Sequence, residues 1–160
     1  MNQESTIKKK SSQTALHCSV GLLARREHSE FELRQKLNTR EFAVDDIDNA
    51  IKRLLAKDYL SDTRFAISTC RYRANRGYGW RYISNELQQK GVCSIILQQL
   101  QNNCEIDWYL QAELAYNKRF GEMTAISFDA VQKEKAKRIR FLQYRGFSSD
   151  EIFCVSEHLR

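Results

Sequence analysis

Basic and aromatic side chains crowd the middle of this 160-residue chain, and they are its most evident chemistry. Between Arg64 and Lys90 the only carboxylate is Glu86. Arginine and lysine attract phosphate backbones and acidic protein surfaces, and aromatic rings can stack on bases or anchor an interface. We therefore expect contacts with DNA or a protein through Arg71, Arg73, Arg76, Tyr78, Trp80, Arg81 and Lys90. The alternative interpretation is a solvated helix face whose tyrosines cover a thin core.

A second basic block precedes the C-terminus and carries Glu134 as its one acidic residue. It gives a second candidate surface, formed by Lys137, Arg138, Arg140 and Arg145. A long helix needs a solvated side in any case, so this block has a simpler structural explanation than the first. The formal net charge of +6 favours an acidic or phosphate-bearing partner for either surface.

Residue types that support catalysis or metal binding are present but scattered. The three histidines are far apart in sequence, and His28 adjoins a helix cap rather than an evident nucleophile. The five cysteines form no CxxC pair, which a zinc site of thiolate ligands would need. We therefore expect no enzyme activity, no metal and no cofactor.

The chain carries no apolar run near the roughly 20 residues that span a bilayer. Residues 1–12 are polar, include three consecutive lysines and lack the apolar core of a secretory signal, so they predict a disordered basic tail. Together with free thiols, these features predict a cytoplasmic protein without membrane contact.

The elements that must position the basic residues are helices, because the chain contains no proline and shows no sustained alternation typical of strands. The same helix ending occurs three times: an apolar residue precedes a second one by five positions, with basic residues and usually a glycine between them. The pairs are Leu37 with Phe42, Leu87 with Val92, and Leu142 with Phe147. The second members lie about fifty residues apart, which is typical of a helical repeat protein.

This periodicity predicts an all-α fold of nine helices in three tandem three-helix repeats. We expect the repeats at residues 13–61, 62–106 and 107–160. Capping boxes are predicted at Ser29 with Glu32 and at Ser148 with Glu151, while Asp62 is expected to cap the fourth helix. In the first helix, Leu16, Val20 and Leu23 are expected to share the buried face.

Four sequence blocks resemble the RecX regulatory proteins in the order in which that family has them. Residues 22–33 resemble its "LLxRREHSxxEL" opening, residues 58–66 its "GYLDDxRFA" signature, and residues 73–91 its "RxxRGYGxxxIxxELxxKG" stretch. Residues 133–147 resemble its "KxKxxRFLQYRGF" ending. The resemblance covers about residues 15–159, nearly the whole chain.

Three positions depart from the family pattern. Glu41 and Asp58 stand where the family usually has glycine, so those helix ends must close without the residue that most easily adopts a left-handed backbone. Trp80 stands where proline is frequent, which permits the fifth helix to begin differently.

The resemblance implies a modulator of the RecA recombinase, active in homologous recombination, DNA repair and the SOS response. It implies three three-helix units in an elongated, curved monomer that binds the RecA–DNA filament and inhibits the RecA ATPase, strand exchange and co-protease activities. It also implies weak, sequence-tolerant binding to single- or double-stranded DNA. The sequence leaves open whether such a protein caps filament ends or coats the filament groove.

An alternative function is an independent DNA-binding module of the helix-turn-helix type. The short helix-turn units and the positive charge are compatible with it. This alternative predicts sequence-selective duplex binding by the protein alone, whereas a filament regulator depends on RecA.

Overall fold

The computed structural model describes residues 14–120 and 127–157, and all regular structure within these ranges is helical. The predicted basic tail at 1–12 and residues 122–126 of the linker before the eighth helix lie outside them. The prediction of an all-α fold is confirmed. The described helices are α1 (Ala15–Leu23), α2 (Glu30–Asn38), α3 (Val44–Ala56), α4 (Asp62–Asn75), α5 (Trp80–Gln89), α6 (Ser94–Asn103), α7 (Trp108–Arg119), α8 (Phe128–Tyr144) and α9 (Ser149–Glu157).

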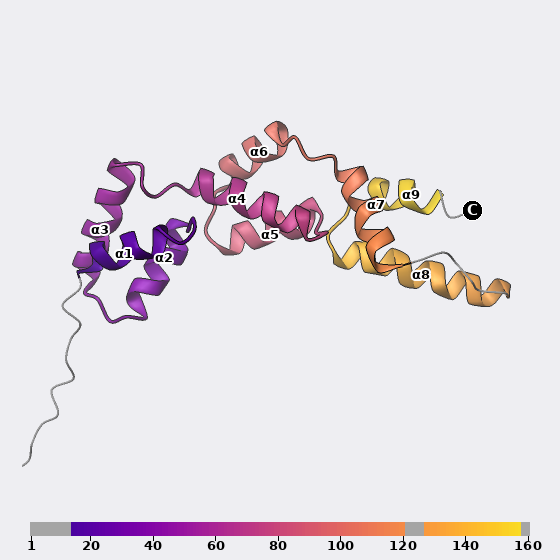
Figure 1. The fold of residues 1–160 in the computed structure, drawn as a ribbon, viewed down its shortest axis with the longest axis horizontal. Coiled ribbons are helices and arrows are strands. Elements are labelled where there is room, and N and C mark those ends of the chain that lie inside the picture. The colour runs from indigo at the N-terminus through magenta and orange to yellow at the C-terminus, as the bar shows by residue number, and fades with distance from the viewer. Residues whose placement is uncertain (1–13, 121–126, 158–160) are drawn as a thin grey trace, which may run out of the picture. The chain divides into compact units, whose positions relative to one another are not determined.

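The chain divides into two compact units, Met1–Leu60 and Ser61–Arg160. The first holds α1, α2 and α3, which pack around a core that includes Leu33, Ile51 and Leu54 (Figure 1). Phe31, Val44 and Leu55 lie outside this core and are exposed. Burial of its leucine and isoleucine side chains stabilises the unit by about 1.5–3 kcal/mol for each residue.

The second unit contains two further helix triplets, each with its own core. Helices α4, α5 and α6 surround Phe65, Ile83 and Leu87, while α7, α8 and α9 surround Leu142 and Phe147 (Figure 1). The described chain therefore consists of three three-helix groups, as the periodicity of the sequence predicts.

The three predicted helix endings share one geometry. In each, the amide of the second apolar residue donates to the carbonyl of the first: Phe42 to Leu37 at 3.4 Å, Val92 to Leu87 at 3.0 Å and Phe147 to Leu142 at 3.2 Å. The preceding residue has positive φ in each case, as in the Schellman motif. Two more ends close in this way, with bonds from Tyr59 to Leu54 at 2.9 Å and from Tyr78 to Arg73 at 3.1 Å.

Glu41 and Asp58 adopt the left-handed backbone themselves, with φ of 60° and 55°. A side chain in this conformation costs of the order of 1 kcal/mol, because its Cβ approaches the backbone. The two helix ends therefore keep the geometry of a glycine cap without the glycine.

The helix starts agree in part with the caps predicted from the sequence. Both halves of the Ser148–Glu151 capping box form, at 2.7 Å and 3.3 Å. The prediction that Asp62 caps α4 is wrong: the Ser61 hydroxyl accepts the amide of Arg64, and Asp62 is the first helical residue. Val20 is 46% exposed, so its predicted place on the buried face is also wrong.

Candidate nucleic-acid interface

Within the second unit, the turn between α4 and α5 pairs with the turn between α8 and α9. The Gly79 amide donates to the Arg145 carbonyl at 2.8 Å, and the Arg81 amide donates to the Gly146 carbonyl at 3.0 Å. A Cβ at Gly79 would lie 2.5 Å from the Gly146 oxygen. The glycines at these turns thus allow two backbones to meet, and the contact joins the second helix triplet to the third.

Arg145 reinforces this junction from the side. Its Nη1 donates to the Arg76 carbonyl at 2.9 Å, and its guanidinium lies 4.5 Å from the centre of the Tyr78 ring and 5.2 Å from that of Phe141. A cation over two aromatic faces is stabilised by their quadrupoles. The structure brings together Tyr78 and Arg145, which the sequence assigned to two separate candidate surfaces.

Arg73 is held by an internal ion pair. Its Nε and Nη2 each donate to a carboxylate oxygen of Glu86 at 2.7 Å, and Lys90 lies 3.4 Å from the same carboxylate. Burial acts to raise the pKa of Glu86, but the hydrogen bonds and charges of Arg73 and Lys90 outweigh it, so this pKa lies below its usual 4.5. The charges of both predicted contact residues are thus partly neutralised inside the protein.

The remaining cations of the middle segment are more open. Arg71, Arg76 and Arg81 are exposed, and Arg76 donates to the Tyr72 hydroxyl at 2.6 Å. Trp80 is half-buried, with its ring centre 6.1 Å from that of Trp108, so it contributes to the core of the triplet.

The second predicted surface divides in a similar way. Lys137 and Arg140 are exposed on α8. Arg138 is buried, with its Nε donating to Glu134 at 3.1 Å and its Nη1 donating to the Tyr116 hydroxyl. The prediction that Arg138 lies on an open basic surface is therefore wrong, because a side chain buried inside the third triplet is not available to a partner.

A hollow of about 520 Å³ lies between α5, α7 and α8 of the second unit, next to the paired turns. Its side walls carry positive charge and aromatic rings, and no carboxylate is among the lining residues. We call it the basic-aromatic hollow. It is lined by Tyr78, Tyr82, Arg119, Phe120, Lys137, Arg140, Phe141, Tyr144 and Arg145.

The sequence-based site contains Tyr78, Lys137, Arg140 and Arg145 but not the rest of this hollow. One signal was available: Lys137, Arg140, Phe141 and Tyr144 recur at helical spacing, which places them on one face of α8. The contribution of α7, through Arg119, had no signal in the sequence, because it depends on how the triplets pack.

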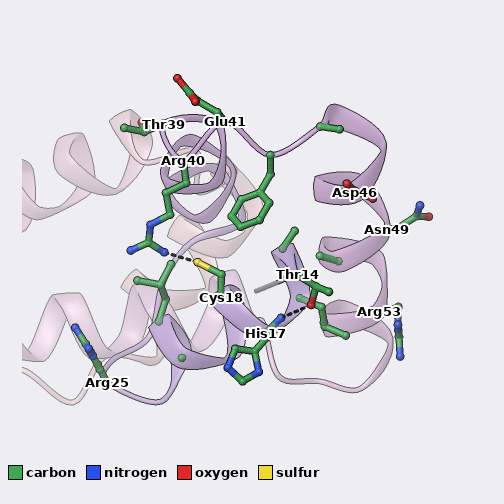
Figure 2. Close-up of a pocket in the computed structure, with 17 residues that line it drawn as sticks. Thr14, His17, Cys18, Arg25, Thr39, Arg40, Glu41, Asp46, Asn49 and Arg53 are labelled. Carbon is green, nitrogen blue, oxygen red and sulfur yellow. Dashed lines mark hydrogen bonds between the residues drawn. The ribbon is translucent and has the colours of Figure 1, made fainter. Parts of the chain in front are cut away.

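A larger hollow, of about 1140 Å³, lies in the first unit between α1 and α3. None of the predicted contact residues lines it. Figure 2 shows Arg40 reaching to Cys18, while Arg25, Glu41 and Arg53 point away from the hollow. Its charges are of both signs and do not converge, so it offers no defined recognition chemistry.

The described residues contain no group of three or more histidine, cysteine, aspartate or glutamate side chains placed to hold a metal ion. Burial, together with contact with Cys104, raises the pKa of the Cys70 thiol to about 12, which makes it a poor nucleophile. None of the helices in the part of the chain that the structure describes has the length and apolar character to cross a membrane.

Known proteins share the arrangement of three three-helix groups. The three three-helix domains of RecX match in order, at residues 15–54, 61–99 and 105–155. A regulatory protein RecX of Vibrio parahaemolyticus is 41% identical over 134 residues, which cover 84% of each chain. The chain belongs to the RecX family. A RecX of Haemophilus influenzae is similar to it, with 40% identity over 142 residues, 88% of this chain and 91% of the relative.

Solved RecX structures have the same fold. A crystal structure of RecX from Lactobacillus salivarius has a TM-score of 0.70 at 20% identity and covers 91% of this chain and 94% of its own. A second RecX crystal structure has a TM-score of 0.71 at 18% identity, with 89% and 71% covered. Membership of the RecX family assigns a regulatory role to this chain.

The family domains also locate the candidate residues. The exposed Arg71, Arg76 and Arg81 all belong to the second RecX domain, while Lys137 and Arg140 belong to the third. The basic-aromatic hollow takes residues from both domains. It lies where the backbone of the α4–α5 turn meets that of the α8–α9 turn.

Proposed function

We propose that this RecX-family protein binds the RecA–DNA filament and inhibits the ATPase, strand-exchange and co-protease activities of RecA. The observation that carries the proposal is the exposure of Arg71, Arg76 and Arg81 within the second RecX domain. Exposed cations of this kind attract the phosphates of DNA or the carboxylates of a protein filament. The protein acts by binding rather than by catalysis, and it acts in the cytoplasm as a monomer.

Three helical domains in one chain suit a partner with repeating subunits. Contacts made at the same time to neighbouring subunits raise the effective affinity without new chemistry at any one of them. If the protein binds one state of the filament better than another, it holds the filament in that state and opposes the rearrangements that ATP turnover requires.

The first test is the single-stranded-DNA-dependent ATPase of the cognate RecA during titration with this protein. A fall in rate at substoichiometric ratios supports action at filament ends or over several subunits, while a fall only near saturation supports coating of the filament. An unchanged ATPase with a folded, helical protein contradicts the proposal and leaves an independent role in binding DNA.

The contact residues are tested with Arg71→Glu/Arg81→Glu. Both side chains are exposed and neither belongs to the core of the second triplet, so the variant keeps its helices. We expect half-inhibition of the RecA ATPase to need at least tenfold more of this variant than of the unchanged protein. Each reversed charge removes an attraction and adds a repulsion. The matched control is Lys52→Glu/Lys57→Glu, which reverses two exposed charges in the first unit and leaves inhibition within about twofold. Equal inhibition by both variants removes these arginines from the interface.

A further inference from the structure

We propose that the basic-aromatic hollow is a nucleotide-holding site, which binds an unstacked base and its phosphate from single-stranded DNA. The inference rests on the proposed function for its biological setting, which is the RecA–DNA filament. The hollow would hold a strand by base stacking and charge together, independently of the sequence of the bases.

The charge of the hollow favours a phosphate group. Arg119, Lys137, Arg140 and Arg145 supply four cations among nine lining residues, and the other five residues are aromatic. Arg145 is already fixed by the Arg76 carbonyl and two rings, so it forms a positive wall with little freedom left to lose on binding. Lys137 has a Glu134 oxygen 3.3 Å away, but the Lys137 side chain is 62% exposed, so water weakens this contact.

Four rings of the hollow form two pairs, and the Arg145 guanidinium contacts one ring of each, Tyr78 and Phe141. Tyr78 and Tyr82 lie 4.3 Å apart between ring centres, at 30° to one another. Phe120 and Phe141 lie 5.2 Å apart, edge to face. Two aromatic pairs in contact with one guanidinium give a wall of rings and cations, to which a planar base and its phosphate are complementary.

Tyr144 is the ring of the hollow that is open to a partner, because it is 90% exposed at the end of α8. A large aromatic side chain in water, beside a cationic hollow, is available to stack on an incoming base without rearrangement of the core. The five rings also distinguish a nucleotide from an acidic peptide. Carboxylates need the cations alone, whereas each base offers a π face to the rings.

The volume of the hollow agrees with this ligand. About 520 Å³ lies within the 300–1,000 Å³ typical of small-molecule sites, and it is enough for one nucleotide rather than a duplex. A duplex keeps its bases stacked inside and shows only phosphates to a surface of this kind. The proposed ligand is therefore a single strand with at least one base turned outward.

The test uses the full chain and DNA without RecA, so that it can fail separately from the proposed function. A fluorescein-labelled oligodeoxythymidylate of about 15 nucleotides is titrated by anisotropy, in parallel with a strand of the same length that consists of abasic sites. We expect Tyr144→Ala to weaken binding of the thymidylate strand about tenfold and to change binding of the abasic strand by less than twofold.

Tyr109→Ala is the matched control for the ring, because Tyr109 is 51% exposed on α7 and does not line the hollow. We expect it to bind both strands as the unchanged protein does. If Tyr144→Ala and Tyr109→Ala behave alike, no base stacks in the hollow and the proposal is overturned.

A second pair of variants tests the phosphate. Lys137→Ala should lower the slope of log K against log salt by about 0.7, which is the value for one phosphate contact on a single strand. Lys133→Ala removes an exposed lysine from the same helix outside the hollow and should leave the slope unchanged. Two further results also contradict the proposal: equal binding of abasic and thymidylate strands by the unchanged protein, which indicates recognition of any anionic chain, and no binding of the thymidylate strand at all.

Discussion

Gly79 and Gly146 meet backbone to backbone, so closely that a methyl group on Gly79 would lie 2.5 Å from the Gly146 oxygen and 2.7 Å from its carbonyl carbon. Gly146 also has a φ of 84°, whereas φ at Gly79 is −85° and is open to any residue. Gly79 is therefore required for space alone, which makes its substitution a clean test of the junction between the second and third triplets.

We predict that Gly79→Ala destabilises the second unit by about 2–3 kcal/mol, because the new methyl group forces two backbones apart. The measurement is hydrogen exchange of the amides at positions 79 and 81, which donate across the junction. Gly21→Ala is the control: nothing lies within 4 Å of a Cβ there, and alanine in place of glycine within α1 should stabilise by about 0.5–1 kcal/mol. Unchanged protection in Gly79→Ala would contradict the role of this contact.

The Arg73–Glu86 pair yields a second prediction. Lysine cannot make the two parallel hydrogen bonds of this pair, so Arg73→Lys should lower the free energy of unfolding by about 1–2 kcal/mol in urea denaturation. Arg34→Lys changes a more exposed arginine, which pairs at the surface with Glu30 and Asp48, and should cost no more than about 0.5 kcal/mol. Equal costs for the two substitutions would show that burial of the Arg73 pair adds nothing.

The buried His28 makes the first unit sensitive to acid. Burial lowers its pKa below 6.5, aided by the charges of Arg26 and Lys36 and opposed by the hydrogen bond to Glu32. The unfolded chain therefore binds more protons just below pH 6.5, so that this contribution to stability is complete above pH 6.5 and is lost as the pH falls. We predict a smaller drop in Tm between pH 7.5 and 5.5 for His28→Gln than for the unchanged protein.

The exposed His17 provides the control for that experiment, since His17→Gln should leave the drop in Tm unchanged. Glu32 causes a second loss of stability, at lower pH. Burial acts to raise its pKa, but hydrogen bonds from Arg26 and His28 lower it to about 2 from 4.5. Its contribution is present above pH 4.5 and is lost as the pH falls toward 2. For His28, an equal drop in Tm between pH 7.5 and 5.5 in the His28→Gln and His17→Gln variants would contradict the predicted acid sensitivity.

The left-handed backbone at Glu41 leads to a stabilising substitution. Glu41→Gly removes a Cβ from a residue with φ of 60° and should raise the free energy of unfolding by about 0.5–1 kcal/mol. Glu41→Ala keeps the Cβ and serves as the control, with no gain expected. Urea denaturation at constant m-value measures both. A gain in Glu41→Ala equal to that in Glu41→Gly would assign the effect to loss of the carboxylate.

The helix ends were predictable because their causes are local. The pairing of Leu87 with Val92 around a glycine lies within six consecutive residues, and the backbone bond it predicts is present at 3.0 Å. The Ser148–Glu151 capping box is equally local and also forms. The three-helix groups follow from repetition of such ends along the chain.

The candidate site was less predictable, because the fate of each basic side chain depends on distant residues. Arg73 pairs with a glutamate on the next helix, and the buried Arg138 reaches Tyr116 on another helix. In sequence these arginines resemble Arg71 and Arg140, which are exposed. Only the packing of the helices separates cations that stabilise the protein from those available to a partner.

The contact between the two turns also has a kinetic consequence. The Arg145–Arg76 bond joins residues 69 apart, whereas the helix ends close over a few residues. Closing a long loop is entropically costly, so we expect each triplet to form first and the docking of the third onto the second to follow. Loss of that contact should then accelerate unfolding and leave the folding rate nearly unchanged. The junction would thus set how long the second unit stays folded, rather than how fast it folds.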